Sequence, residues 1–126
     1  MPTNRGRTRR PASPHRVPRV TRLNELIREV VAEELERIGD ERLDLVTITN
    51  VDVDNDLNRA IITFDSLGGP EKDAPILAAL GELRVKLQAA LARQITARKT
   101  PIFVFRPDEV IRAAERIDEI IRRQQD

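Results

Sequence analysis

Two short β-branched segments separated by a polar turn constrain the fold of this chain most strongly. The segments are LVTITNVDV (residues 45–53) and RAIITFDSL (59–67), and the turn between them is DNDLN. Valine, isoleucine and threonine favour extended backbone, whereas aspartate and asparagine favour turns. The pattern therefore predicts an antiparallel β-hairpin, which ends at Gly68, Gly69 and Pro70.

Helical patterns surround this hairpin, and one further strand follows it. Gly39 stands where the first helix should end, and Thr100-Pro101 should break the second helical pattern. The predicted ranges are a helix over 21–38, a helical segment over 75–97, a strand over 102–105 and a last helix over 108–123. This order of helices and strands places the chain in the α+β class.

A glycine interrupts the second helical pattern. Gly81 lies inside ILAALGELRVKLQAAL (76–91), where glycine costs about 1 kcal/mol relative to alanine. Because glycine lets the backbone leave helical geometry, we expect a break at Gly81, with two helices over 75–80 and 82–97 that meet at an angle. The alternative is a glycine tolerated within one straight helix.

The composition indicates one small domain with a tail. The chain has 126 residues and no cysteine, which excludes disulfides, thiolate metal sites and thiol nucleophiles. No apolar run approaches the roughly 20 residues that a membrane-spanning helix needs, and the start lacks the apolar centre of a secretion signal. We therefore expect a soluble protein in the cytoplasm, without contact with a membrane.

The near-neutral net charge of +1 hides a separation of charge along the chain. Residues 1–24 hold seven arginines and no acidic residue, whereas the remainder holds 15 basic and 21 acidic residues. A basic arm rich in proline, serine and threonine cannot bury enough apolar surface to fold alone, so we expect residues 1–19 to be disordered. Arginine arms of this kind commonly contact nucleic acid, although a solubilising or artificial terminus is the alternative reading.

Catalytic and metal-binding patterns are incomplete. Asp52, Asp54 and Asp56 alternate as in a calcium loop, but Leu57 replaces the required glycine and Thr63 replaces the bidentate glutamate. Alternating carboxylates on the solvent face of a strand explain these aspartates more simply. The single histidine lies in the arm, and the sequence has neither a phosphate-binding glycine loop nor a nucleophile elbow. The residues therefore predict neither an enzyme nor a metal or other cofactor.

Short motifs are distributed over about residues 16–123. They are Asp40, Arg42 and Leu43 before the first strand, VTIT within it, Asp56-Leu57 before the second strand, Ala79-Leu80-Gly81 followed by Leu83 and Arg84, Thr100-Pro101 with Phe105 and Asp108, and Arg116-Ile117. Each motif alone is weak, but their joint order and spacing are specific. Together they resemble the bacterial ribosome-binding factor A family (RbfA).

The resemblance implies a KH-like domain of type II topology, with the order α-β-β-α-kink-α-β. In that family an Ala-x-Gly kink replaces the GxxG loop of ordinary KH modules, so Ala79, Leu80 and Gly81 are expected to form the kink. The implied organisation is a disordered basic arm over 1–19, a KH-like domain over 20–107, and a C-terminal helix and tail over 108–126.

The resemblance also implies a function. Family members bind the small (30S) ribosomal subunit during late maturation, contact its 16S rRNA, support processing of the RNA's 5′ end and matter especially in the cold. The expected protein is a monomeric RNA-binding factor without catalytic activity, with a ribosome-associated GTPase as a further partner that promotes release. A small protein-interaction or dimerisation domain without a direct RNA role is the alternative.

The candidate RNA contacts are basic residues around the second helical segment and at the end of the arm. On a helical wheel, Val85, Ala89 and Ala92 form a small outward face that Lys86 and Arg93 flank, although an ordinary solvated face remains the alternative. Without tyrosine or tryptophan, recognition should depend on RNA shape and backbone. The predicted contacts are Arg84, Lys86, Arg93, Arg98, Lys99, Arg16, Arg19 and Arg22, with Arg112, Arg116, Arg122 and Arg123 of the last helix as further candidates.

Overall fold

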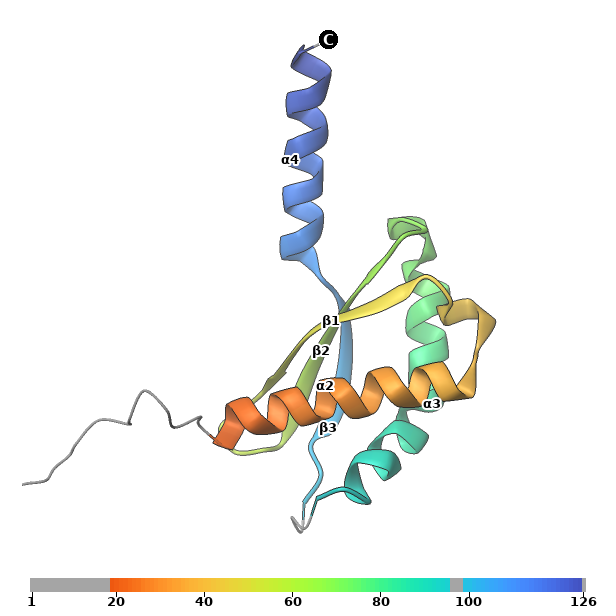
Figure 1. The fold of residues 1–126 in the computed structure, drawn as a ribbon, viewed down its shortest axis with the longest axis vertical. Coiled ribbons are helices and arrows are strands. Elements are labelled where there is room, and N and C mark those ends of the chain that lie inside the picture. The colour runs from red at the N-terminus through yellow and green to blue at the C-terminus, as the bar shows by residue number, and fades with distance from the viewer. Residues whose placement is uncertain (1–18, 96–98, 126) are drawn as a thin grey trace, which may run out of the picture.

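The computed structural model describes residues 19–95 and 99–125, and the predicted α+β order is confirmed (Figure 1). Element ends differ from the predicted ones by at most two residues, except at the end of α3. The elements are α2 (Arg19–Ile38), β1 (Val46–Val53), β2 (Arg59–Ser66), α3 (Asp73–Ala92), β3 (Ile102–Pro107) and α4 (Glu109–Gln125), with two single 3₁₀ turns, η1 (Glu41–Leu43) and η2 (Pro70–Lys72).

The predicted disordered arm lies almost wholly outside the described residues, so that prediction stays untested. Arg19, which the sequence placed in the arm, is the first residue of α2. At the other end of α2, Gly39 adopts a left-handed φ of 68° and donates its N–H to the carbonyl of Leu35 at 3.1 Å. The helix therefore ends where the glycine predicted.

The three strands form one sheet in the order β1-β2-β3. The hairpin pairs β1 with β2 antiparallel, with an irregularity in the register between Ile48 and Asn50, whereas β3 pairs parallel to β2. A parallel pairing requires a crossover connection, which α3 provides. The sheet thus brings residues near 60 and 104 together, although a whole helix separates them in sequence.

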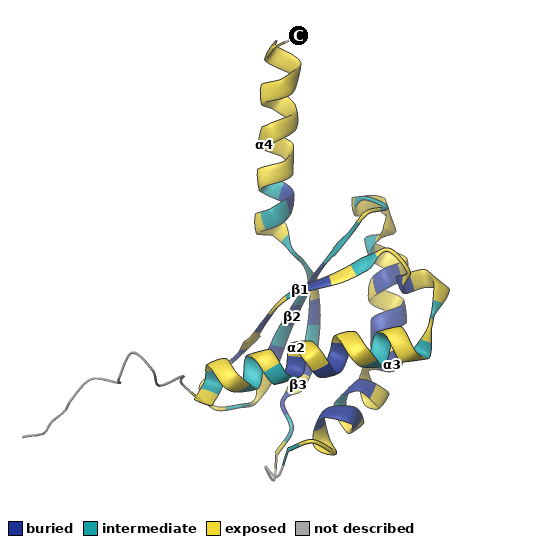
Figure 2. Ribbon diagram, viewed as in Figure 1, coloured by how far each residue is buried: buried dark blue, intermediate teal, exposed yellow. Residues whose placement is uncertain are grey.

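Helices α2 and α3 cover one face of the sheet, and the core lies between the two layers (Figure 2). Alternate residues of each strand point into this core, as the pleat of a strand requires. The largest fully buried side chains include Phe64 and Phe103 of the sheet, Ile27 of α2, and Leu80 and Leu87 of α3. The opposite face of the sheet has no helix over it within the described residues.

Two side-chain amides tie the helices to the edges of the sheet. Asn24 of α2 accepts the N–H of Val53 at 2.8 Å, and Gln88 of α3 accepts the N–H of Phe103 at 2.9 Å. Each bond satisfies a backbone donor on an edge strand, where no neighbouring strand is available. The positions of both helices relative to the sheet are therefore fixed by polar contacts as well as by the core.

Helix α3 runs unbroken through Gly81, so the predicted break between two helices is wrong. Its path curves in Figure 1, but Gly81 does not adopt a positive φ and the helix continues to Ala92. The physical reason is that one glycine costs only about 1 kcal/mol. Good helix formers on both sides, with Leu80 and Leu83 buried against the core, outweigh that cost.

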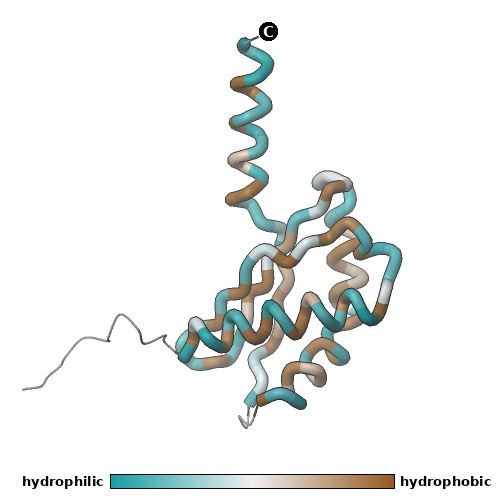
Figure 3. Tube along the Cα trace, viewed as in Figure 1, coloured by the Kyte–Doolittle hydropathy of each residue, from teal (hydrophilic) through white to brown (hydrophobic). Residues whose placement is uncertain are grey.

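Helix α4 stands away from the two layers and leaves the end of β3 as a single projecting rod (Figures 1 and 3). None of its residues belongs to the described hydrophobic core, and Val110, Ile117, Ile120 and Ile121 are exposed. The direction of α4 therefore depends on contacts at its base. None of the described helices is long and apolar enough to span a membrane.

Candidate nucleic-acid interface

The outward side of α3 carries a row of small residues. Its members are Ala74, Ala78, Gly81, Val85, Ala89 and Ala92, all of which are exposed. Spacings of three and four residues place them on one side of the helix, opposite the buried Leu83 and Leu87. The predicted small outward side of this helix is confirmed, and Val85 is 77% exposed.

Lys86 and Arg93 follow one flank of this row, on the side of α3 that faces α2. They are seven residues apart, which brings them to nearly the same side of the helix, and both are exposed. Neither forms an ion pair within the described residues. Arg84 lies two residues before Lys86 and therefore projects on the other flank. The row of small residues, which we call the α3 face, thus has basic groups on both sides.

Glu34 of α2 is an acidic group close enough to this basic flank to interact with its charges. It is held by Arg37 through a 2.5 Å ion pair, and this bond is the main reason why the pKa of Glu34 lies below its ordinary value. The charges of Arg93 and Lys86 lower the pKa of Glu34 further. Because Arg37 already holds Glu34, both α3 cations remain available to an external anion.

A second group of predicted contacts gathers where α2 begins. Arg19, Leu23, Leu57, Ile95 and Lys99 are among the residues that line one hollow, although 80 positions separate Arg19 from Lys99. Lys99 donates a hydrogen bond to the side-chain oxygen of Asn58 in the hairpin turn. The sequence carried no signal for this juxtaposition, because it depends on how α2 and the hairpin turn approach each other.

The remaining predicted contacts are divided between exposed positions and undescribed ones. Arg22 is exposed on α2, one turn from Arg19. Arg16 and Arg98 lie outside the described residues, so the structure does not place them. All six described candidates (Arg84, Lys86, Arg93, Lys99, Arg19 and Arg22) are exposed, as contact with a phosphate backbone requires.

An ion-pair clamp joins the α2–β1 connection to α3 directly beside Gly81. Arg42 bonds Asp40 at 2.7 Å and Glu82 at 2.9 Å, and these hydrogen bonds lower the pKa of both carboxyl groups. Glu82 therefore has a partner within the domain, and it offers no aromatic ring to an RNA base. All three phenylalanines of the chain are buried, so they offer no stacking surface either.

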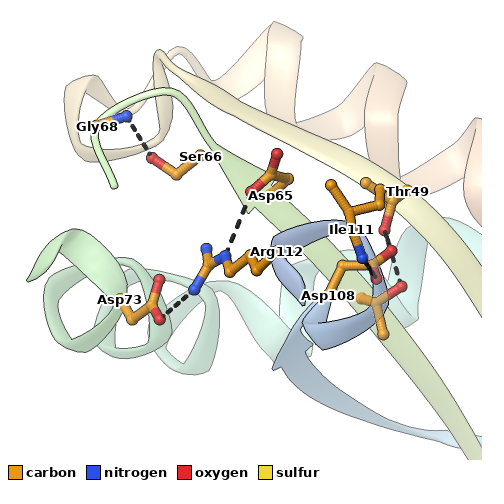
Figure 4. Close-up of polar contacts among 9 residues, drawn as sticks. Thr49, Asp65, Ser66, Gly68, Asp73, Asp108, Ile111 and Arg112 are labelled. Atoms are coloured by element: carbon orange, nitrogen blue, oxygen red, sulfur yellow. Dashed lines mark hydrogen bonds and ion pairs between the residues drawn. The ribbon is translucent and has the colours of Figure 1, made fainter. Parts of the chain in front are cut away.

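The structure corrects the role predicted for Arg112. This residue was expected to contact RNA, but its side chain is buried, and the residue as a whole is only 6% exposed. Its guanidinium reaches Asp73 at 2.5 Å and Asp65 at 3.3 Å (Figure 4). A guanidinium is held this way because a buried charge is tolerated only when paired. By contrast, Arg116, Arg122 and Arg123 are exposed, and Arg123 pairs with Glu119.

Comparison with known protein families identifies the family of this chain. A family model described as ribosome-binding factor A matches residues 19–121. The chain belongs to the ribosome-binding factor A family. Among similar proteins, the ribosome-binding factor A of Kocuria rhizophila is 38% identical over 105 residues, which cover 82% of this chain and 69% of that protein. The one from Rhodopseudomonas palustris is 36% identical over 126 residues, covering 97% and 90% respectively.

Solved structures of RbfA proteins share the fold. The crystal structure of ribosome-binding factor A from Thermus thermophilus superposes with a TM-score of 0.62 at 28% identity, over 70% of this chain and 94% of that one. A homology model of the T. thermophilus protein, fitted into a cryo-electron-microscopy map of a 30S–RbfA complex, gives a TM-score of 0.56 at 29% identity, over 68% and 90%. The family resemblance predicted from the motifs is thereby confirmed.

Proposed function

We propose that this protein binds the small ribosomal subunit and contacts its 16S rRNA. The observation that carries the proposal is the family match over residues 19–121, which includes every element of the described fold except the last four residues of α4. The similar T. thermophilus protein has been fitted into a map of its complex with the 30S subunit, which supports the same partner here. The exposed basic residues around the α3 face supply the chemistry that an RNA surface requires.

The proposed contacts are to the RNA backbone. Lys86, Arg93 and Arg84 would hold phosphates along the α3 face, where the small side chains let a backbone approach closely. Arg19, Arg22 and Lys99 would extend these contacts towards the start of α2, and Arg16 and Arg98 belong to the same proposal. Since the phenylalanines are buried, the shape of the RNA rather than base stacking should determine recognition.

The finer features of the proposal come from the family resemblance. The protein would act in the cytoplasm as a monomer, late in assembly of the subunit, and support processing of the 5′ end of 16S rRNA, particularly in the cold. A ribosome-associated GTPase would promote its release. It would act stoichiometrically, without catalytic turnover.

Co-sedimentation with purified small subunits over a series of salt concentrations tests the proposal. The test variant is Lys86→Ala/Arg93→Ala, and the matched control is Arg59→Ala/Arg106→Ala. The control removes two exposed cations from the open face of the sheet, away from α3. If Lys86 and Arg93 each hold one phosphate, the slope of log affinity against log salt becomes shallower by about 1.4 to 1.8 in the test variant.

The comparison of these two variants separates local contact from general charge. An unchanged slope in the control, with a shallower slope in the test variant, would support the α3 face as the contact. Equal losses in both variants would mean that net charge alone governs binding. Failure of the wild-type protein to sediment with small subunits would refute the proposed function itself.

A further inference from the structure

Three charged residues at the base of α4 form a cluster that joins the helix to both layers of the domain. Arg112 lies in the first turns of α4, Asp65 lies near the end of β2, and Asp73 is the first residue of α3. The Nε of Arg112 donates to Asp65 at 3.3 Å, and an Nη donates to Asp73 at 2.5 Å. We call these three residues the basal cluster (Figure 4). A single guanidinium thus connects α4 to the sheet and to α3.

A second polar contact fixes the residue just before α4. Asp108 accepts the hydroxyl of Thr49 at 2.6 Å and the N–H of Ile111 at 3.1 Å, so that it both caps the helix and bonds to β1. Its own N–H donates to the carbonyl of Phe64 at 2.7 Å. The position at which α4 starts is therefore held by Asp108. One turn later, the guanidinium of Arg112 lies 6.0 Å from the centroid of the Phe64 ring.

Apolar packing does not hold the rest of α4. From Ala114 to Gln125 every residue is exposed, and no described residue of α4 belongs to the core cluster. Ile117 and Ile121 lie about 140° and 180° around the helix from Arg112, so they face away from the side that Arg112 anchors, whereas Ile120 lies about 80° from it. Burial of an apolar face therefore does not orient this part of the helix, which leaves the polar contacts at its base.

The basal cluster is incompletely bonded. Arg112 Nη2 and Asp73 Oδ1 are buried without a hydrogen-bond partner among the described residues. Charged groups taken out of water gain little net stability unless their remaining donors and acceptors are satisfied, although their geometry is highly directional. Such a cluster restricts the direction of α4 through its hydrogen-bond geometry, but it adds only modestly to the stability of the fold.

We propose that Arg112 is a positioning residue, which directs α4 relative to α3 through its two carboxylates and thereby strengthens binding to the small subunit. The binding step rests on the proposed function. Because α3 also starts at the cluster, a fixed α4 presents the exposed arginines of its outer half at a constant distance from the α3 face. Without a fixed direction, α4 would have the orientation required for binding to the small subunit in only a fraction of the molecules. The apparent affinity is then reduced in proportion to that fraction.

Distance measurement between paired spin labels tests the positioning role directly. The chain has no cysteine, so Glu29→Cys on α2 and Gln124→Cys on α4 accept labels at two exposed positions without other changes. The wild-type background should give one narrow distance distribution. Arg112→Met, which keeps a long side chain but removes the charge, should broaden that distribution severalfold, and Asp73→Asn should broaden it less.

Arg116→Met is the matched control, because Arg116 is an exposed arginine on the same helix with no ion pair among the described residues. Its distribution should match that of the wild type. Circular dichroism at 222 nm shows whether Arg112→Met keeps its helices, and Arg112→Lys provides a second, milder variant if it does not. A narrow, unshifted distribution in Arg112→Met or Arg112→Lys would overturn the positioning role.

Affinity for purified 30S subunits tests the second half of the proposal in the same proteins. If the directed state falls to about a tenth of the population in Arg112→Met, binding weakens about tenfold. A broadened distribution with unchanged affinity would overturn the contribution to binding. If the wild type does not bind small subunits at all, the proposed function fails, but the distance distributions still decide whether Arg112 directs α4.

Discussion

Replacing Gly81 with alanine provides the sharpest test of the continuous α3. An added Cβ at Gly81 would meet nothing within 4 Å, and the residue has no positive φ. The substitution therefore removes the conformational freedom of glycine without a steric cost, and the expected gain is about 0.8 to 1.0 kcal/mol in the free energy of unfolding. For a folded region of this size, that gain corresponds to a rise of about 4 °C in the unfolding midpoint.

Gly39→Ala is the matched control for this experiment. An added Cβ there also meets nothing within 4 Å, but Gly39 has a φ of 68°. Alanine in the left-handed region costs roughly 1 to 2 kcal/mol, so this variant should unfold at a lower temperature than the wild type. The two glycines thus differ in backbone conformation rather than in available space.

Thermal and urea unfolding, followed by circular dichroism at 222 nm, measure both variants. A lower midpoint for Gly81→Ala would refute the reasoning, because it would mean that α3 needs a non-helical backbone at this position. A separate outcome concerns binding, since the new methyl group also raises the surface of the α3 face. Weaker binding to small subunits by a more stable protein would place Gly81 at the contact itself.

Three further predictions follow from the charges and caps. Deleting residues 1–15 removes four arginines and should keep the fold, while the slope of log affinity against log salt becomes shallower by about 3 to 4; an unchanged slope would show that the arm does not touch RNA. Asp108→Asn should lower the free energy of unfolding by about 1 kcal/mol at pH 7, because a neutral amide oxygen accepts the hydrogen bonds from Thr49 and Ile111 less strongly than the carboxylate does. The hydrogen bond from Thr49 is the main cause of the lowered pKa of Asp108 in the folded protein. The Asp108 carboxylate therefore stabilises the fold fully above its unfolded pKa of about 3.9, and this stabilisation is lost as the pH falls through its folded pKa. Urea titrations from pH 7 to pH 3 should show wild type and variant converging in acid, and a constant difference would contradict this. Glu82→Leu should change stability by less than about 1 kcal/mol, since the Arg42–Glu82 pair is exposed, and a loss above about 2 kcal/mol in urea would show that the clamp is structural.

Local patterns were sufficient to predict the order of helices and strands and the outward face of α3. Periodicity identified both long helices, because a helix that packs on a sheet must repeat its apolar residues with the helical period. Gly39 marked a real helix end, since its left-handed φ is a local property of the chain. The exposure of Lys86 and Arg93 followed from the same helical wheel.

The sequence by itself therefore determined the order of the elements and their buried sides, which depend on neighbouring residues. It also determined the family, which the joint order and spacing of the motifs indicate. Only the tertiary structure decided that Gly81 remains helical and that Arg112 is buried. Gly81 stays helical because contacts on both sides of it, made with distant parts of the chain, outweigh its local preference. Arg112 is buried because Asp65 and Asp73, 47 and 39 positions away, meet at the base of α4. No local pattern distinguishes such an arginine from an exposed one, since the partners that neutralise it come together only when the sheet and α3 have packed.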